Sequence, residues 1–184
     1  MSYLDQYRIS LSGLKEGAHE YRFDVDDTFF ESFEHSEIQR GSVKIDILLH
    51  KNPGGYILEF SLSGFIMVQC DRCLEPFNLA VSYETIAYAK LNEDEDYGDE
   101  DSFTLTPGCD ELDLSQMIFD YIILSQPLSK IHPDDENGNS TCNQEMLGRL
   151  NSHMIDNVDD VDEEIDPRWN ELKKLINNKQ NGTS

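Results

Sequence analysis

The sequence reads Cys70-Asp71-Arg72-Cys73-Leu74-Glu75-Pro76-Phe77 at the point where two stretches of alternating apolar and polar residues meet. Alternation of this kind predicts two β-strands, so the two thiols are expected to face the same way at the tip of a hairpin. Paired cysteines at this spacing are typical ligands of Zn²⁺, which binds thiolate and imidazole in a tetrahedron. The stretch therefore predicts a zinc knuckle, and a knuckle needs two further ligands.

His132 and Cys142 are the candidates for these ligands, and they bracket a polar loop of nine residues, 133–141. Their separation is wider than the usual spacing of paired zinc ligands. Other interpretations remain open: the paired cysteines as small buried apolar residues at a strand end, or the histidine as a cap on a preceding helix. Cys109 follows Pro107-Gly108 without a second motif, and we expect it to be a packed thiol.

The chemistry of a close cysteine pair depends on the compartment. The first residues contain neither a basic segment nor an apolar one, and the sequence has no apolar span of about 20 residues, so we expect neither a signal peptide nor a membrane helix. A cytoplasmic location follows as a prediction, and there metal or redox chemistry explains the pair better than disulfides. Redox pairs normally precede a helix, whereas Pro76 and a strand-like run follow here, which favours zinc.

Most of the chain shows β-type alternation. Strands are predicted at 7–11, 21–25, 43–49, 56–69, 77–89 and 103–105. The three that surround the turn at 52–55 and the knuckle should form an antiparallel meander, and Gly64 is expected to mark a bulge. A short helix is expected within 28–37.

Helical spacing appears later in the chain. Asp113 is the predicted N-cap of a long helix, with Gln116 in the capping-box position and Pro127 near the end. Short helices are predicted at 144–151 and 167–178. The predicted fold class is α+β: an antiparallel meander, curled toward a barrel, with one long helix across it and short C-terminal helices.

Domain organisation and charge also follow from composition. We expect a single α+β domain over 1–150, an acidic linker over 151–166, a docking helix over 167–178 and a disordered tail over 179–184. The formal net charge is −23, and seven acids lie in each of the runs 93–101 and 156–166. The simpler explanation, which we favour, is that both runs are solvated linkers. Such a chain repels phosphate backbones at long range, so basic protein partners are favoured over naked nucleic acid.

The motifs resemble a known family. The run from Val68 to Phe77 resembles the CxRCxxP segment of the bacterial large-subunit ribosomal RNA accumulation protein family YceD. The run from Ile118 to Cys142 and the segment beginning Asp166-Pro167-Arg168-Trp169 are also similar to the family, so the resemblance spans about residues 41–176. Many members carry a fuller cysteine cluster where this chain has Cys142 alone. The resemblance carries over to Cys70, Cys73, His132 and Cys142.

The resemblance implies a role in accumulation or maturation of large-subunit ribosomal RNA. One hypothesis is a non-enzymatic biogenesis factor that binds a ribosomal protein or a large-subunit assembly intermediate through its acidic surface. A second is direct binding of ribosomal RNA through the sheet and knuckle, with Arg72 at the knuckle tip as the contact. The weakest is a zinc-dependent nuclease or hydrolase using Glu75 or Asp71 as a base, and the sequence has no phosphate loop or nucleophile motif that would support it.

Overall fold

The structure is a computed structural model that describes residues 3–34, 36–91, 102–105 and 108–154. The chain divides into two compact units, Met1–Leu147 and Gly148–Ser184, and each is described by itself. The predicted acidic linker, docking helix and tail lie outside the described residues, except for 151–154 at the start of that linker.

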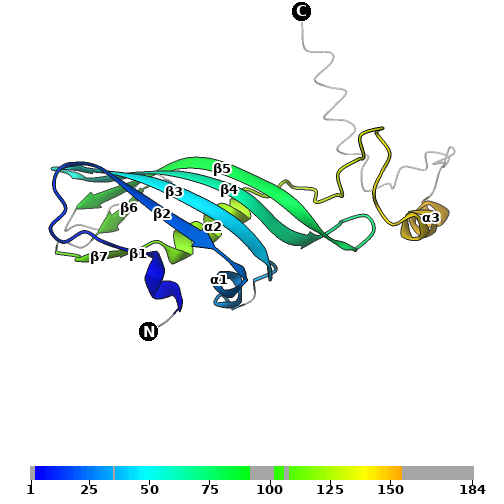
Figure 1. The fold of residues 1–184 in the computed structure, drawn as a ribbon, viewed down its shortest axis with the longest axis horizontal. Helices are drawn as coiled ribbons and strands as arrows, with labels where there is room; N and C mark the ends of the chain where they lie inside the picture. Colours follow the sequence, from blue (N-terminus) through cyan, green and yellow to red (C-terminus); the bar gives the residue numbers. More distant parts are fainter. Residues whose placement is uncertain (1–2, 35, 92–101, 106–107, 155–184) are drawn as a thin grey trace, which may run out of the picture. The chain divides into compact units, whose positions relative to one another are not determined.

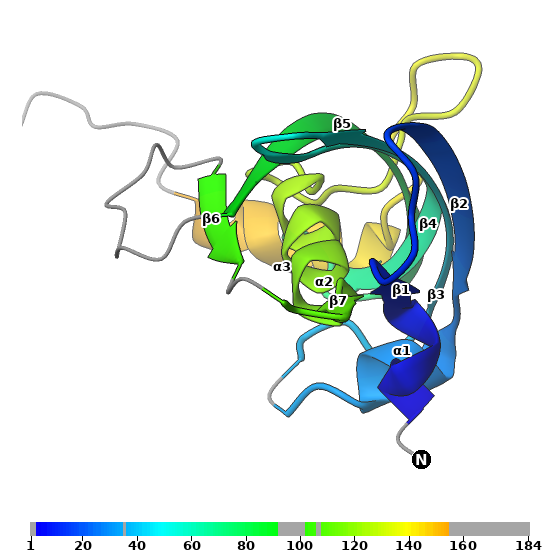
Figure 2. The same cartoon turned by 90° about the vertical axis from the view of Figure 1, so that its left-hand side faces the viewer.

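A five-stranded sheet forms the body of the first unit, in the order β2-β3-β4-β5-β6 (Figure 1). Its strands are β2 (Gly17–Val25), β3 (Gly41–Asn52), β4 (Gly55–Gln69), β5 (Pro76–Leu91) and β6 (Ser102–Leu105). Strands β2 to β5 pair antiparallel, whereas β6 pairs parallel to β5. The sheet curls around the helix α2 (Ser115–Leu124), and the strands surround it in the end view of Figure 2.

The core lies between the inner face of this sheet and α2. Alternation in β3 places Val43, Ile45, Ile47 and Leu49 inward, and each is at most 2% exposed. Leu114, Ile118 and Ile122 bring the apolar side of α2 against them and are fully buried. The ring of Tyr121 packs edge-on against Phe60 of β4, with centroids 5.0 Å apart. The period of two in the strands and of three to four in the helix therefore bury one common core.

Short elements close the ends of this core. The 3₁₀ helix η1 (Tyr3–Tyr7) leads into β1 (Arg8–Ser10), which pairs antiparallel with β7 (Glu111–Asp113) in a separate two-stranded sheet. Helix α1 (Asp27–Glu31) is capped by the Asp26 carboxylate, which accepts hydrogen bonds from two backbone N–H groups.

Helix α3 (Gln144–His153) is the last described element. No helix in the described ranges has the length and apolar character needed to cross a membrane.

The predicted fold class is wrong. The chain is mostly β, its main sheet is mixed rather than antiparallel, and the longest helices in the described part, α2 and α3, have ten residues each. The expected closure toward a barrel is absent as well, because β2 and β6 are the unpaired edges of the described sheet. The sheet was expected to be purely antiparallel because periodicity predicts that β6 is a strand but carries no information on whether it runs parallel to β5.

Two local expectations also fail. Gly64 lies in an unbroken ladder opposite Val43 and Val81, so it marks no bulge. The cap of α2 is Leu114 rather than Asp113, although the Asp113 carboxylate still accepts the Ser115 N–H at 2.9 Å. The Gln116 amide donates to Asp120 and does not complete a capping box.

Candidate metal centre

The hairpin between β4 and β5 forms the knuckle. The Cys70 N–H donates to the Glu75 carbonyl at 3.0 Å, and the Leu74 N–H donates to the Cys70 carbonyl at 2.9 Å. Leu74 closes this turn with φ of 60°, a left-handed conformation that is uncommon outside glycine. The tight turn leaves both cysteine side chains on one side, where Cys70 is 0% and Cys73 is 1% exposed.

The loop between α2 and α3 supplies the second pair of side chains. A β-bridge joins Asp134 to Ser140, and the Asp135 carboxylate accepts the N–H groups of Asn137 and Asn139. The Thr141 hydroxyl donates to the Pro133 carbonyl at 2.7 Å and closes the base of the loop. These hydrogen bonds bring His132 and Cys142, which flank the loop, close together, although nine residues separate them.

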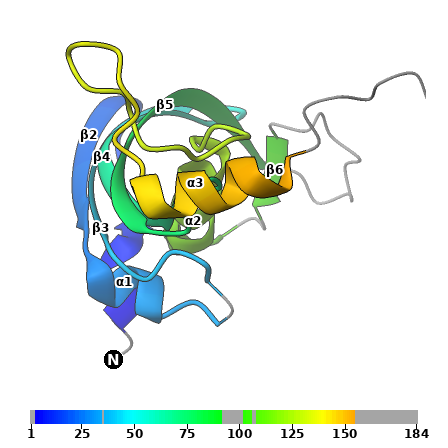
Figure 3. The ribbon, with the colours of Figure 1, turned by 90° about the vertical axis from the view of Figure 1, so that its right-hand side faces the viewer.

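Direct hydrogen bonds hold this loop against the knuckle, at the end of the sheet seen in Figure 3. The Asp71 N–H donates to the Lys130 carbonyl at 2.7 Å, and the Lys130 N–H donates to the Asp71 carboxylate at 2.6 Å. The Asn143 amide donates to the Glu75 carboxylate at 2.6 Å, while its oxygen caps the first turn of α3. Knuckle and loop therefore form one assembly built from two distant parts of the chain.

Four ligand atoms meet inside this assembly. The sulfur atoms of Cys70, Cys73 and Cys142 and a ring nitrogen of His132 all lie within 4.8 Å of one another. A regular tetrahedron around zinc places sulfur atoms about 3.8 Å apart and sulfur and nitrogen about 3.6 Å apart. The Cys70 and Cys142 sulfur atoms are 3.7 Å apart, and the His132 Nδ1 lies 3.4 Å from Cys73 Sγ and 3.7 Å from Cys142 Sγ. These three separations fit a tetrahedral metal centre.

The electrostatics of the thiols also suit a cation. Burial raises the pKa of the Cys70 thiol, but hydrogen bonds from the Cys73 and Arg72 backbone and from His132 outweigh it and bring the pKa down to about 6. The Ser140 hydroxyl lowers the pKa of the Cys142 thiol, whereas burial and the neighbouring sulfur atoms raise it, and the net shift is upward. The Cys70 thiol therefore ionises readily, and its negative charge opposes ionisation of the Cys142 thiol. A divalent cation relieves that conflict by neutralising several thiolates at once.

An apolar shell encloses the centre. The partly buried side chains of Phe77, Ile131, Met146 and Leu147 pack against the three buried cysteines. The Phe77 ring lies against the His132 ring, with centroids 4.6 Å apart, and this contact fixes the plane of the imidazole. Phe77 also packs against the main core, so it links the metal centre to the sheet.

The other residues named from sequence lie elsewhere or act differently. Cys109 stays outside the cluster, where its thiol donates to the Glu111 carbonyl at 2.9 Å. Arg72 is exposed at the knuckle, and its side chain makes no hydrogen bond or ion pair with the described residues. The two proposed bases, Asp71 and Glu75, hold the loop and α3 in place. The sequence reasoning missed Asn143, although an asparagine directly before a predicted helix is an N-cap signal.

Comparison with known proteins adds to this geometry. The family described as Large ribosomal RNA subunit accumulation protein YceD matches residues 58–176, which is well over half of the chain. The chain belongs to the YceD family. The resemblance seen in the motifs is thereby confirmed, and the matched range includes all four members of the cluster. No curated protein and no solved structure matches the chain.

The family description implies a role in accumulation of the ribosomal RNA of the large subunit. Within the YceD-family range, β4, the knuckle and the loop before α3 build the candidate metal centre from residues 70–142. The family match and the cluster therefore point to the same part of the chain.

Proposed function

We propose that this chain is a non-enzymatic ribosome-biogenesis factor. It supports accumulation or maturation of large-subunit ribosomal RNA by binding a ribosomal protein or an assembly intermediate. The observation that carries the proposal is the closed Cys₃His cluster in a YceD-family chain, because a closed centre stabilises a fold rather than performing chemistry.

The cluster is assigned as a structural zinc site held by Cys70, Cys73, Cys142 and His132. Three sulfurs and one imidazole are ligands that zinc prefers over Mg²⁺ or Ca²⁺. When bound, the ion supplies a cross-link between the β4–β5 hairpin and the loop before α3. The three cysteines are nearly fully buried and His132 is partly buried, so water has little access to the sulfur atoms.

A hydrolytic site is a poorer fit. Catalytic zinc keeps one position open for water and has a base beside it. In the proposed centre the four protein side chains would complete the tetrahedron and leave no position for water. Glu75 and Asp71 are engaged in hydrogen bonds that hold the fold. We expect Glu75→Ala to weaken the attachment of α3. We expect it to cause no loss of hydrolytic activity, because none is proposed.

The partner is expected to be basic. A formal net charge of −23 attracts cationic proteins and repels RNA, and ribosomal proteins are the cationic proteins that accompany ribosomal RNA. Binding to such a partner should weaken as salt concentration rises, since exposed charges are screened.

Direct RNA binding is the second candidate function. A cleft of about 670 Å³ lies beside the knuckle, and Arg40, Lys130 and Asp71 line it. Arg72 presents a further guanidinium nearby in the chain. If RNA is the ligand, charge reversal at Arg40 and Arg72 abolishes binding to a large-subunit RNA fragment, and binding to a ribosomal protein is unchanged.

Metal content per chain tests the site. Protein purified without chelator should contain one zinc, and Cys73→Ser, Cys142→Ser and His132→Ala should each lose it. Cys109→Ser is the matched control and should retain the metal, because this thiol lies outside the cluster. Wild-type protein without zinc, or metal loss in the Cys109 variant, would contradict the assignment.

The cellular role is tested separately. In cells depleted of this protein, large-subunit ribosomal RNA should fall relative to small-subunit ribosomal RNA, and the wild-type gene should restore it. An unchanged ratio would refute the role whatever the metal content.

A further inference from the structure

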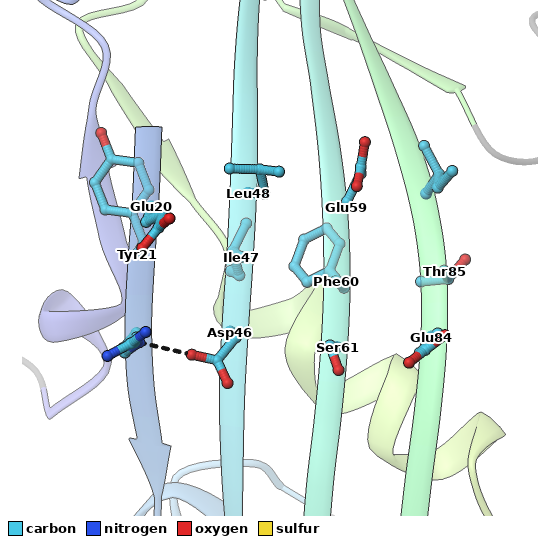
Figure 4. A pocket seen from close by; sticks show the side chains of 12 residues that line it. Glu20, Tyr21, Asp46, Ile47, Leu48, Glu59, Phe60, Ser61, Glu84 and Thr85 are labelled. Carbon is cyan, nitrogen blue, oxygen red and sulfur yellow. Dashed lines mark hydrogen bonds and ion pairs between the residues drawn. The ribbon is translucent and has the colours of Figure 1, made fainter. Parts of the chain in front are cut away.

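A shallow groove crosses the outer face of the main sheet, on the side opposite α2 (Figure 4). Its cavity volume is about 640 Å³, and it runs over β2, β3, β4 and β5. The strand register places two neighbouring rows of side chains along it. The first row is Glu20, Leu48, Glu59 and Ile86. The second row is Arg22, Asp46, Ser61 and Glu84. Figure 4 shows Leu48 level with Glu59 and, one step along the strands, Asp46 level with Ser61 and Glu84.

The charge of this groove is strongly negative and poorly compensated. Four carboxylates face one guanidinium, and that guanidinium, on Arg22, is already paired with Asp46 at 2.8 Å. Glu20 and Glu84 have no hydrogen-bond or ion-pair partner among the described residues. Two carboxylates, at the β2 and β5 ends of the groove, are therefore open to an external cation.

Apolar side chains alternate with these acids. In the first row, Leu48 lies between Glu20 and Glu59, and Ile86 follows Glu59 on β5 with 44% of its surface exposed. An open sheet face normally presents polar residues to water. Lysine and arginine side chains match such an alternation, because their aliphatic stems cover apolar surface while their heads reach carboxylates.

We propose that this groove binds a Lys/Arg-rich segment of a partner protein in extended conformation. Four adjacent strands span about 14 Å, which is the length of about four extended residues. Cationic heads contact Glu20 and Glu84, which are unpaired among the described residues, and Glu59, whose carboxylate lies 3.5 Å from His50 Nε2. The stems cover Leu48 and Ile86. RNA is disfavoured in the same groove, since its phosphates would face carboxylates. The inference rests on the proposed function, because it specifies the chemistry and the place at which a ribosomal partner binds.

Binding of a fluorescein-labelled decalysine peptide, followed by anisotropy at low salt, tests the groove. Glu59→Lys with Glu84→Lys should weaken binding at least tenfold. The control pair Glu31→Lys with Glu34→Lys changes the net charge equally on exposed positions near α1 and should weaken binding less than threefold. Equal weakening by both pairs, or no binding to the wild type, would overturn the proposal by reducing the effect to net charge alone.

An uncharged pair of variants tests the apolar part. Ile86→Ser should weaken the same peptide about fivefold, whereas Phe65→Ser should not, although Phe65 is equally exposed on a neighbouring part of the sheet. Equal effects of the two changes would overturn the stem contacts.

Labelled oligouridylate is the alternative probe. If Glu59→Lys with Glu84→Lys strengthens RNA binding or leaves it unchanged, the result agrees with a protein-binding groove. RNA binding abolished by that pair would assign the surface to RNA and refute the inference.

Cells separate this inference from the proposed function. If wild-type protein restores large-subunit ribosomal RNA and Glu59→Lys with Glu84→Lys does not, while the control pair does, both stand. If the groove variant restores it fully, the groove assignment fails and the proposed function survives. If the wild type has no effect on the RNA, the proposed function itself fails.

Discussion

Among the described residues, Leu74 is the one non-glycine residue with a positive φ. It takes φ of 60° at the knuckle, yet its side chain is 59% exposed and buries little in return. A left-handed conformation costs a non-glycine residue about 1–2 kcal/mol. The knuckle keeps this conformation because the Leu74 N–H must reach the Cys70 carbonyl while both thiols face the centre.

Leu74→Gly is therefore expected to raise the free energy of unfolding by about 1 kcal/mol. Urea unfolding of the metal-loaded protein measures this change. Leu74→Ala is the control, because it removes most of the side chain and keeps the strained backbone, and it should change stability by less than about 0.5 kcal/mol. A gain of equal size in the alanine variant would show that the exposed leucine, not φ, carries the cost.

At this scale the sequence predicted which side chains lie together, while their role as metal ligands stays a prediction. The CxxC spacing singled out Cys70 and Cys73, and the ends of the polar loop supplied His132 and Cys142 as candidates. The structure brings the ligand atoms of all four within 4.8 Å of one another. The close approach of the two ends of the loop was not predictable, because the bridge between Asp134 and Ser140 depends on turn geometry that composition does not specify.

Strand β4 shows how an element is constrained by its neighbours. A Cβ added at Gly64 would lie 2.2 Å from the Ser42 carbonyl oxygen and 2.7 Å from the Val43 Cα, both backbone atoms of β3. These backbone atoms cannot move aside by a change of rotamer, as a side chain could. Glycine is thus required for the close approach of β3 and β4 in the curled sheet.

Gly64→Ala is expected to destabilise the protein by about 2–3 kcal/mol, at the upper end of overpacking costs, because two paired strands must separate. Thermal unfolding should show a clear fall in Tm. Gly54→Ala is the matched control in the β3–β4 turn, where an added Cβ meets nothing within 4 Å, and it should shift Tm by at most a degree or two. Similar losses at both positions would remove the steric explanation.

Element types were easier to predict than element partners. Alternation located β3, β4 and β5 and their antiparallel pairing. It missed β7, which has only three residues, and therefore the pairing of β1 with a segment about a hundred residues away. A three-residue strand is too short to display a period, and its stability comes from the partner rather than from its own sequence.

For the whole molecule, the sequence placed the excess of acids but not the sheet face on which they gather. The net charge of −23 indicated basic partners. The two rows of side chains in the groove, one from Glu20 to Ile86 and one from Arg22 to Glu84 across the strands, can be recognised only when the register of the four strands is known. Register is set by packing of the inner face, so the outer pattern follows from residues such as Ile47 and Phe60 that lie on the opposite side.

The described part of the chain contains two separate buried clusters, and this separation predicts the effect of metal removal. The main core includes the inner face of β3 and β4 together with α2, whereas the three cysteines form a cluster of their own that touches the core through Phe77. Hydrogen-exchange mass spectrometry should therefore show faster exchange after chelation at 70–77 and 130–147. The amides of β3 and central β4 should keep their protection, because their hydrogen bonds and packing do not involve the centre.

The same chelator added to Cys73→Ser provides the control for that experiment, since a variant without the metal should show no further change. The Asp71 and Lys130 amides are the most informative reporters, because each donates across the junction between knuckle and loop. Loss of protection throughout β3 on chelation would mean that the fold as a whole depends on the metal. In that case the zinc would act as a folding cofactor for the entire unit instead of a local cross-link.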